Sequence, residues 1–82
     1  MYYVYILYSE KCNRYYTGYC ADVSARLIRH NSGMVTATRN CKPYKICAIK
    51  EFSTDIEARK EEIRIKKQKS RTYIESLIAG NW

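Results

Sequence analysis

Two segments, Tyr2–Tyr8 (YYVYILY) and Arg14–Cys20 (RYYTGYC), carry the strongest structural signal in this sequence. Both are rich in aromatic and β-branched side chains, which favour strands, and the polar stretch Ser9–Asn13 joins them. They therefore predict the two strands of a β-hairpin. Because residues two apart share one face of a strand, Tyr5 and Tyr16 are expected to be neighbours if the register brings them level.

The middle of the chain predicts one short helix and a third strand. Asp22 is suited to cap a helix that ends at His30, and Asn31–Gly33 supplies residues that tolerate a left-handed turn. Met34–Pro43 has no regular period and is expected to be a basic loop. Tyr44–Phe52 regains strand character, so this segment is expected to join the hairpin.

The last third of the chain predicts two helices. Thr54–Glu57 has the form of a capping box, and no helix breaker follows it before Lys69. Ser70 can cap a last helix that ends at Gly80. The element order β-β-α-β-α-α indicates an α+β fold, a small three-stranded antiparallel sheet flanked by helices. One domain over residues 1–82 is expected to hold it.

The charge of the chain favours a polyanionic partner. Fifteen Lys and Arg residues against eight Asp and Glu residues give a net charge of +7, and nucleic acid is the expected partner. The run Arg59–Arg71 holds seven of the basic residues. It is most simply the solvated surface of a helix, and such a surface also neutralises phosphates without reading base sequence.

The four cysteines match no CxxC spacing, and the chain shows no signal peptide before them: Cys12, Cys20, Cys41 and Cys47. A disulfide framework and a zinc site therefore both lack support, and reduced thiols in a cytoplasmic protein are expected. No apolar run approaches the ~20 residues that cross a bilayer. A soluble protein without a membrane partner is therefore expected.

Three polar side chains stand out by their positions in the predicted helices. Arg26 and His30 are four residues apart, so they share one side of the first helix. Val23 and Leu27 are expected to form a separate stripe that faces the core. Glu62 has apolar residues four before it and three after it, which places its carboxylate in a partly apolar stripe. Such a carboxylate requires a partner, and a metal ion is one.

These residues, taken in order, resemble the signature of the GIY-YIG nuclease superfamily. The likeness runs from Tyr3 to about Ile78 and is greatest to the small single-domain bacterial members. The matching positions are Val4-Tyr5-Ile6, Tyr16-Thr17-Gly18, Arg26, His30–Gly33 and the helix segment Glu57–Lys67. Any one of these motifs is weak evidence, but five in the right order are strong.

Three departures from the family pattern accompany the likeness. The first motif has Val-Tyr-Ile where the family name has Gly-Ile-Tyr, and Thr17 stands where the second motif has Ile. Both variants are similar to those of the small bacterial members. Ala37 replaces an aromatic residue that many members carry before a Thr-Arg pair, which leaves the role of this loop open.

The resemblance implies a metal-dependent endonuclease that hydrolyses phosphodiester bonds in nucleic acid, with DNA expected over RNA. Tyr5 and Tyr16 would flank the scissile phosphate, Arg26 would stabilise its charge, and His30 would assist proton transfer. Glu62 would hold a single Mg²⁺ or Mn²⁺ ion. Because nearby positive charge makes a phenol a better base, Tyr16 is the candidate base, with Tyr5 orienting the water.

A further group of basic side chains is expected to bind the nucleic-acid backbone: Arg29, Arg39, Lys42, Lys66, Lys67 and Lys69. Larger relatives gain target choice from attached DNA-binding domains, and none is expected here. Recognition of structure or of single strands, with weak sequence preference, is therefore expected. DNA repair or recombination is the expected setting, and no obligatory protein partner is expected.

Two other functions remain open at this point. A basic module of the same fold could bind nucleic acid without cutting it. A tyrosine-rich sheet that binds another protein would show weak salt dependence, which the net charge of +7 disfavours. Taken singly, strand tyrosines are most often packing residues, and Glu62 is equally suited to an i,i+4 ion pair with Lys66.

Overall fold

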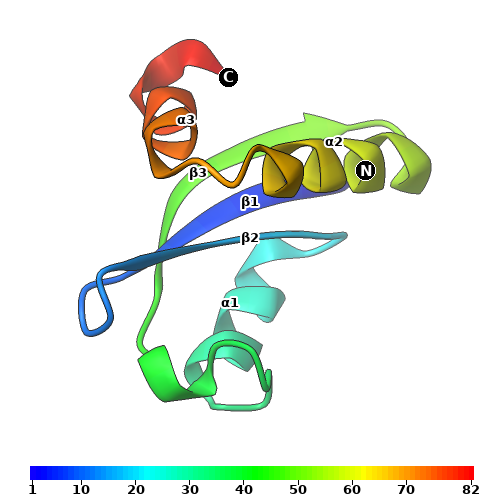
Figure 1. The fold of residues 1–82 in the computed structure, drawn as a ribbon. Helices are drawn as coiled ribbons and strands as arrows, with labels where there is room; N and C mark the ends of the chain where they lie inside the picture. The colour runs from blue at the N-terminus through cyan, green and yellow to red at the C-terminus, as the bar shows by residue number, and fades with distance from the viewer.

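The sheet has three antiparallel strands, and the computed structural model describes all residues from 1 to 82 (Figure 1). The central strand is Tyr2–Ser9 (β1). It pairs with Arg14–Cys20 (β2) on one side and with Lys45–Phe52 (β3) on the other, in the order β2-β1-β3. The predicted hairpin and third strand are confirmed, except that Tyr44 precedes β3 instead of beginning it.

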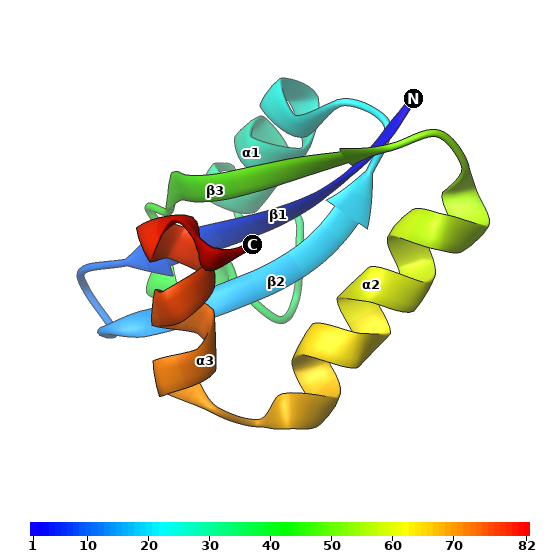
Figure 2. The same ribbon diagram turned by 90° about the horizontal axis from the view of Figure 1, so that it is seen from above.

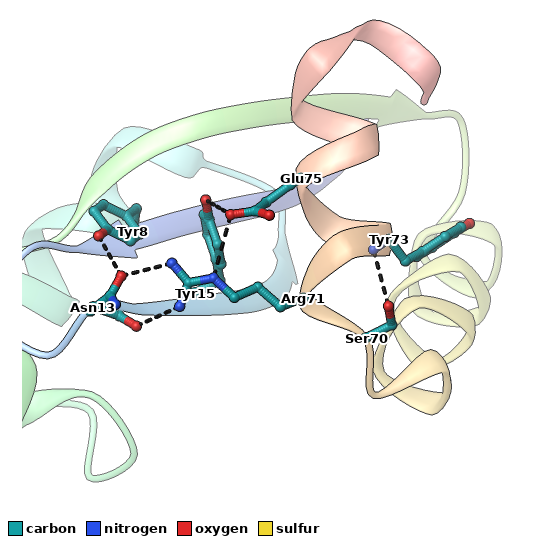
Figure 3. Close-up of polar contacts among 7 residues, drawn as sticks. All are labelled: Tyr8, Asn13, Tyr15, Ser70, Arg71, Tyr73 and Glu75. Carbon is teal, nitrogen blue, oxygen red and sulfur yellow. Dashed lines mark hydrogen bonds and ion pairs between the residues drawn. The ribbon is translucent and has the colours of Figure 1, made fainter.

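The expected helices are present in the expected order, so the α+β prediction is confirmed, although the segment Met34–Pro43, expected to be a loop, also contains a short helix. Their bounds are Val23–Asn31 (α1), Arg39–Cys41 (η1), Asp55–Gln68 (α2), Arg71–Ser76 (α3) and Leu77–Asn81 (η2). The predicted cap residues Asp22, Thr54 and Ser70 accept hydrogen bonds at the starts of α1, α2 and α3; Figure 3 shows the bond at Ser70. None of these helices has the length and apolar character needed to cross a membrane.

The two faces of the sheet are covered by different helices. In Figure 1, α1 and η1 lie on one face, whereas α2 and α3 lie on the other. Viewed from above in Figure 2, α2 runs beside the edge strand β2. The edge of β2 is therefore the place where side chains from both layers can meet.

The hairpin register places Tyr5 and Tyr16 on the α1 face. Tyr5 lies opposite Gly18, and Leu7 lies opposite Tyr16. Because directly opposed residues face the same way, the two tyrosines are diagonal neighbours, as the spacing predicts. The alternate residues of β1 face α2 and α3, where they form an apolar core: Val4, Ile6, Ala58, Ile65 and Leu77.

The prediction of four reduced thiols is wrong for two of the cysteines. Cys12 in the hairpin turn and Cys41 in η1 form a disulfide, whereas Cys20 and Cys47 are free. The Ser9 hydroxyl joins the same two segments, because it donates to the Cys41 carbonyl and accepts from the Cys12 N–H. The bridge depends on a tertiary contact between residues separated by 29 positions, which cysteine spacing does not reveal.

Candidate active site

Tyr5 occupies the middle of β1 and lies across the backbone of β2. Its side chain is 1% exposed. A Cβ atom at Gly18 would stand only 2.4 Å from the Tyr5 Oη atom, so the ring needs a residue without a side chain at this position. Gly18 therefore belongs to the site because it makes room for Tyr5.

His30 is the centre of the cluster and is buried, with 1% of its surface exposed. Its Nε2 atom lies 3.0 Å from Tyr5 Oη, and its Nδ1 atom lies 2.7 Å from Thr38 Oγ1. Thr38 in turn donates to the carbonyl oxygen of Val35. These bonds are all satisfied when neutral His30 carries its proton on Nδ1 and Tyr5 donates to Nε2.

The expected separation of His30 from the apolar stripe of α1 is wrong. Val23 and Leu27 do pack against the core of this face, but His30 lies among the same buried groups. Positions 23, 27 and 30 are three or four residues apart, and such positions fall on one side of a helix. Arg26 belongs to this side too and is half-buried.

The electrostatics of the cluster favour the uncharged forms of both partners. Burial lowers the pKa of His30 below its usual range, and the positive charges of Arg26 and Arg29 lower it further. Burial raises the pKa of Tyr5 strongly, the Tyr16 phenol adds to this, and Arg26 opposes it. The Tyr5–His30 hydrogen bond therefore joins a neutral phenol to a neutral imidazole near neutral pH.

Two more tyrosines surround the imidazole of His30. The ring of Tyr16 lies 4.9 Å from it, centroid to centroid, in an edge-on arrangement, and the ring of Tyr44 lies 6.2 Å away. Asn31 holds Tyr44 in place, because its side chain accepts from the Tyr44 N–H and donates to the Tyr44 carbonyl. Tyr16 is only half-buried and is the tyrosine of the cluster that reaches the β2 edge.

Glu62 approaches the same edge from α2. Lys66 donates to its Oε2 atom at 3.0 Å, and the Lys66 ammonium also lies 5.5 Å from the centroid of the Tyr16 ring. The predicted i,i+4 pair is therefore present, and it joins Glu62 to the tyrosine cluster. The neighbouring Glu61 is committed elsewhere, because Arg64 binds both of its carboxylate oxygens and Trp82 binds one of them.

The donor set at this edge fits a divalent ion that arrives with a phosphate. Glu62 has one oxygen without a protein partner, and no cluster of three or more acidic, His or Cys side chains stands in the structure. Mg²⁺ is commonly held by one or two carboxylates, with water and substrate phosphate completing its coordination. Glu62 can serve as that carboxylate.

The six basic residues expected to bind nucleic acid divide into three places. Arg29, Arg39 and Lys42 are exposed on α1 and the segment after it, on one face of the sheet. Lys66 and Lys69 line a groove beside Tyr16 on the other side of the β2 edge. Lys67 is exposed two positions after the buried Ile65, so it points away from the sheet and from this groove.

Sequence patterns missed two residues of the cluster, Thr38 and Tyr44. Thr38 is fully buried and fixes the tautomer of His30. It lies in the segment where no regular period predicts which side chains face inward. The strand pattern includes Tyr44, but in the structure this residue ends the loop and packs beside His30. The Thr-Arg pair at 38 and 39 was the one available signal for the loop.

Comparison with known proteins agrees with this geometry. The model of the GIY-YIG catalytic domain matches residues 1–74. A UPF0213 protein of Staphylococcus epidermidis is 40% identical over 63 residues, covering 73% of this chain and 77% of that protein. A UPF0213 protein of Halobacterium salinarum is 38% identical over 81 residues, covering 95% of this chain and all of the other, 100%.

A solved structure leads to the same family. The solution NMR structure of a UPF0213 protein from Bacillus halodurans is similar to this chain with a TM-score of 0.60 and 36% sequence identity. The match covers 96% of this chain and 84% of that one. With the family model matched over most of its length, the chain belongs to the GIY-YIG family of nuclease domains.

Proposed function

We propose that this protein is a divalent-metal-dependent endonuclease that hydrolyses phosphodiester bonds of DNA in preference to RNA. The observation that carries the proposal is the meeting of two layers at the β2 edge. Tyr5, Tyr16 and His30 come together on the α1 face, and the Glu62–Lys66 pair reaches Tyr16 from α2. A phosphate at this edge would therefore meet the Tyr16 phenol, a cation and a carboxylate together.

Tyr16 is the proposed base. It is the half-buried tyrosine of the cluster, and its ring lies beside the Lys66 ammonium at the β2 edge. Tyr5 donates a hydrogen bond to His30, which leaves its oxygen lone pairs to accept a hydrogen bond from the attacking water. His30 fixes the Tyr5 hydroxyl and, being neutral, can take up a proton from it.

Arg26 and Glu62 would handle the phosphate charge. The Arg26 guanidinium is always charged and lies close enough to Tyr5 and His30 to affect both pKa values. It would stabilise charge that builds on the phosphoryl oxygens. Glu62 would hold a Mg²⁺ or Mn²⁺ ion, which when bound supplies charge neutralisation to the phosphoryl and leaving oxygens.

The target is proposed to be a single strand or a branched structure, with weak sequence preference. The basic residues of α1, its following segment and the α2 end are spread on both sides of the edge. Contacts of this kind bind backbone phosphates, which carry no base sequence. The net charge of +7 gives steep salt dependence to such binding.

The test is cleavage of labelled single-stranded, duplex and branched DNA, and of single-stranded RNA, with Mg²⁺ or Mn²⁺. Tyr16→Phe, Arg26→Ala and Glu62→Gln should each reduce kcat by at least about 10²-fold. Tyr19→Phe on the opposite face of β2 and Glu51→Gln on β3 are the matched controls, with full activity expected. Binding without metal-dependent cutting by the wild type would instead support a nucleic-acid-binding module.

A further inference from the structure

A groove extends from the candidate site along β2 toward the hairpin turn. It lies between the first half of β2, the end of α2 and the start of α3, and has a volume of about 500 Å³. Tyr16 and Lys66 line it and belong also to the candidate site. Four hydrophobic residues line it and are called its apolar floor: Tyr15, Tyr16, Ile65 and Ile74. Four cations also line it: Arg14, Lys66, Lys69 and Arg71.

One of the four cations has a structural task, which Figure 3 shows. Arg71 donates to the main-chain oxygen of Asn13 at 2.8 Å and to its Oδ1 atom at 2.7 Å, and it pairs with Glu75 at 3.4 Å. Its guanidinium also lies over the Tyr15 ring, 5.0 Å from the centroid. Arg71 thus ties α3 to the hairpin turn and fixes the width of the groove.

The two remaining cations outside the Glu62–Lys66 pair are uncompensated. Arg14 and Lys69 are exposed, and neither takes part in an ion pair or a side-chain hydrogen bond. Lys69 ends α2 with φ of 47°, a left-handed conformation that Gly or Asn usually adopts at such a position. A long basic side chain therefore stands at this turn, although the backbone favours a smaller residue.

We propose that this groove binds one unpaired strand of nucleic acid next to the cut, with phosphates at Arg14 and Lys69 and a base against the apolar floor. The inference rests on the proposed function, since the strand would continue into the Tyr16–Glu62 site. A cationic rim over aromatic side chains is the arrangement that binds single strands. The volume is in the range of small-ligand pockets, so a single unpaired base is the unit that the groove is proposed to hold.

Binding measured without metal separates this inference from the proposed activity. The probe is a fluorescein-labelled thymidylate oligomer, compared with a blunt duplex of equal length, by anisotropy in EDTA over a series of salt concentrations. Arg14→Ala/Lys69→Ala should weaken single-strand binding by roughly tenfold and flatten the salt slope by about 1.4, the value for two phosphate contacts. Lys50→Ala/Lys60→Ala, which removes two exposed charges elsewhere, should leave the slope within experimental error.

A second probe tests the floor of the groove. An abasic oligomer with the same phosphates should bind the wild type several-fold more weakly than the thymidylate oligomer, because it has no base to stack. Equal loss of affinity in both double variants, or equal loss for duplex and single strand, would overturn the groove. If the wild type binds in this pattern but does not cut DNA, the groove proposal stands and the proposed nuclease activity fails. If the wild type cuts and Arg14→Ala/Lys69→Ala leaves cleavage unaffected, the nuclease activity stands and the groove proposal fails.

Discussion

The two faces of strand β1 are built from different chemistry although the same eight residues supply both. Val4 and Ile6 point into a core of aliphatic side chains from α2 and η2. Tyr5 and Leu7 point the other way, where the core includes phenols, cysteines and a buried histidine hydrogen-bonded to a threonine. The first face is held by burial of apolar area, whereas the second adds hydrogen bonds and a disulfide to its apolar contacts.

This contrast explains how a chain of 82 residues keeps a polar cluster buried. Small domains bury a limited share of their surface, and a buried polar group costs free energy unless it is paired. Here every buried side-chain nitrogen and oxygen has a hydrogen-bond partner. The aliphatic face provides stability, so the α1 face can hold groups chosen for reactivity. Substitutions in the aliphatic core should therefore change stability and leave the chemistry unaltered, whereas substitutions around His30 should change both.

The largest loss of stability should come from a core substitution on the face of β1 that packs against α2 and η2, the aliphatic face. Ile6 is fully buried, so Ile6→Ala should lower the free energy of unfolding by about 2–5 kcal/mol in urea denaturation. Cleavage per folded molecule should remain near the wild-type rate. Ile56→Ala is the control, because this side chain is 68% exposed and should change stability little. Loss of activity in the folded fraction would show that the two faces are not separable.

The disulfide gives the next effect, on the other face. Cys12→Ser opens a link between residues 29 positions apart and should cost about 3 kcal/mol of stability under oxidising conditions. Dithiothreitol should lower the stability of the wild type to that of the variant. Cys47→Ser, which removes a free thiol, should keep the dithiothreitol response. Two reactive thiols, those of Cys20 and Cys47, are expected in the wild type by mass spectrometry. Detection of four would contradict the bridge.

A smaller change should follow from Thr38→Val, which keeps the shape of the side chain. The Nδ1–H of His30 would lose its acceptor in a buried place, at a cost of about 1–3 kcal/mol. Because the imidazole orientation also loosens, cleavage should fall more than stability alone explains. Thr36→Val, at an exposed position of the same segment, is the matched control. Unchanged kcat in Thr38→Val would show that this bond has only a packing role.

The pH dependence of stability should show the smallest effect. His30 is the one histidine of the chain, and its pKa in the folded state lies below the ordinary value of 6.5. Between these two values the unfolded chain binds a proton that the folded chain does not, so stability falls as the pH drops below about 6.5. Above that pH the contribution is constant. In His30→Asn the melting temperature should depend less on pH between about pH 5 and 7 than in the wild type. An unaltered pH dependence would show that carboxylates cause it.

The sequence predicts which hairpin residues lie together on one face of the sheet, but it predicts the buried side of α1 less well. Alternation along YYVYILY and RYYTGYC places Tyr5 and Tyr16 together, and the register confirms it. The period of α1 held the same information for His30, whose seven-residue distance from Val23 returns it to the same side. The prediction is wrong there because it groups His30 with Arg26 and separates it from the stripe of Val23 and Leu27.

Other parts of the cluster could not be predicted because they depend on chain segments meeting in three dimensions. The Cys12–Cys41 bridge requires the hairpin turn to reach η1. The bond between Thr38 and His30 requires the irregular loop to fold back over α1. Spacing along the chain does not reveal contacts between such distant segments. The Glu62–Lys66 pair, by contrast, lies within one helix, and its i,i+4 spacing predicts an ion pair as the alternative to metal binding by Glu62.

The bare backbone at Gly18 sets the order in which a lineage can lose this site. While Tyr5 is present, any other residue at position 18 would carry a Cβ atom 2.4 Å from the phenol oxygen. The glycine therefore cannot change first without disturbing the hairpin. Once Tyr5 is replaced by a shorter side chain, position 18 becomes free to vary. A chain with glycine at position 18 and a shorter residue at position 5 should therefore keep the hairpin, whereas a chain with the reverse combination should not.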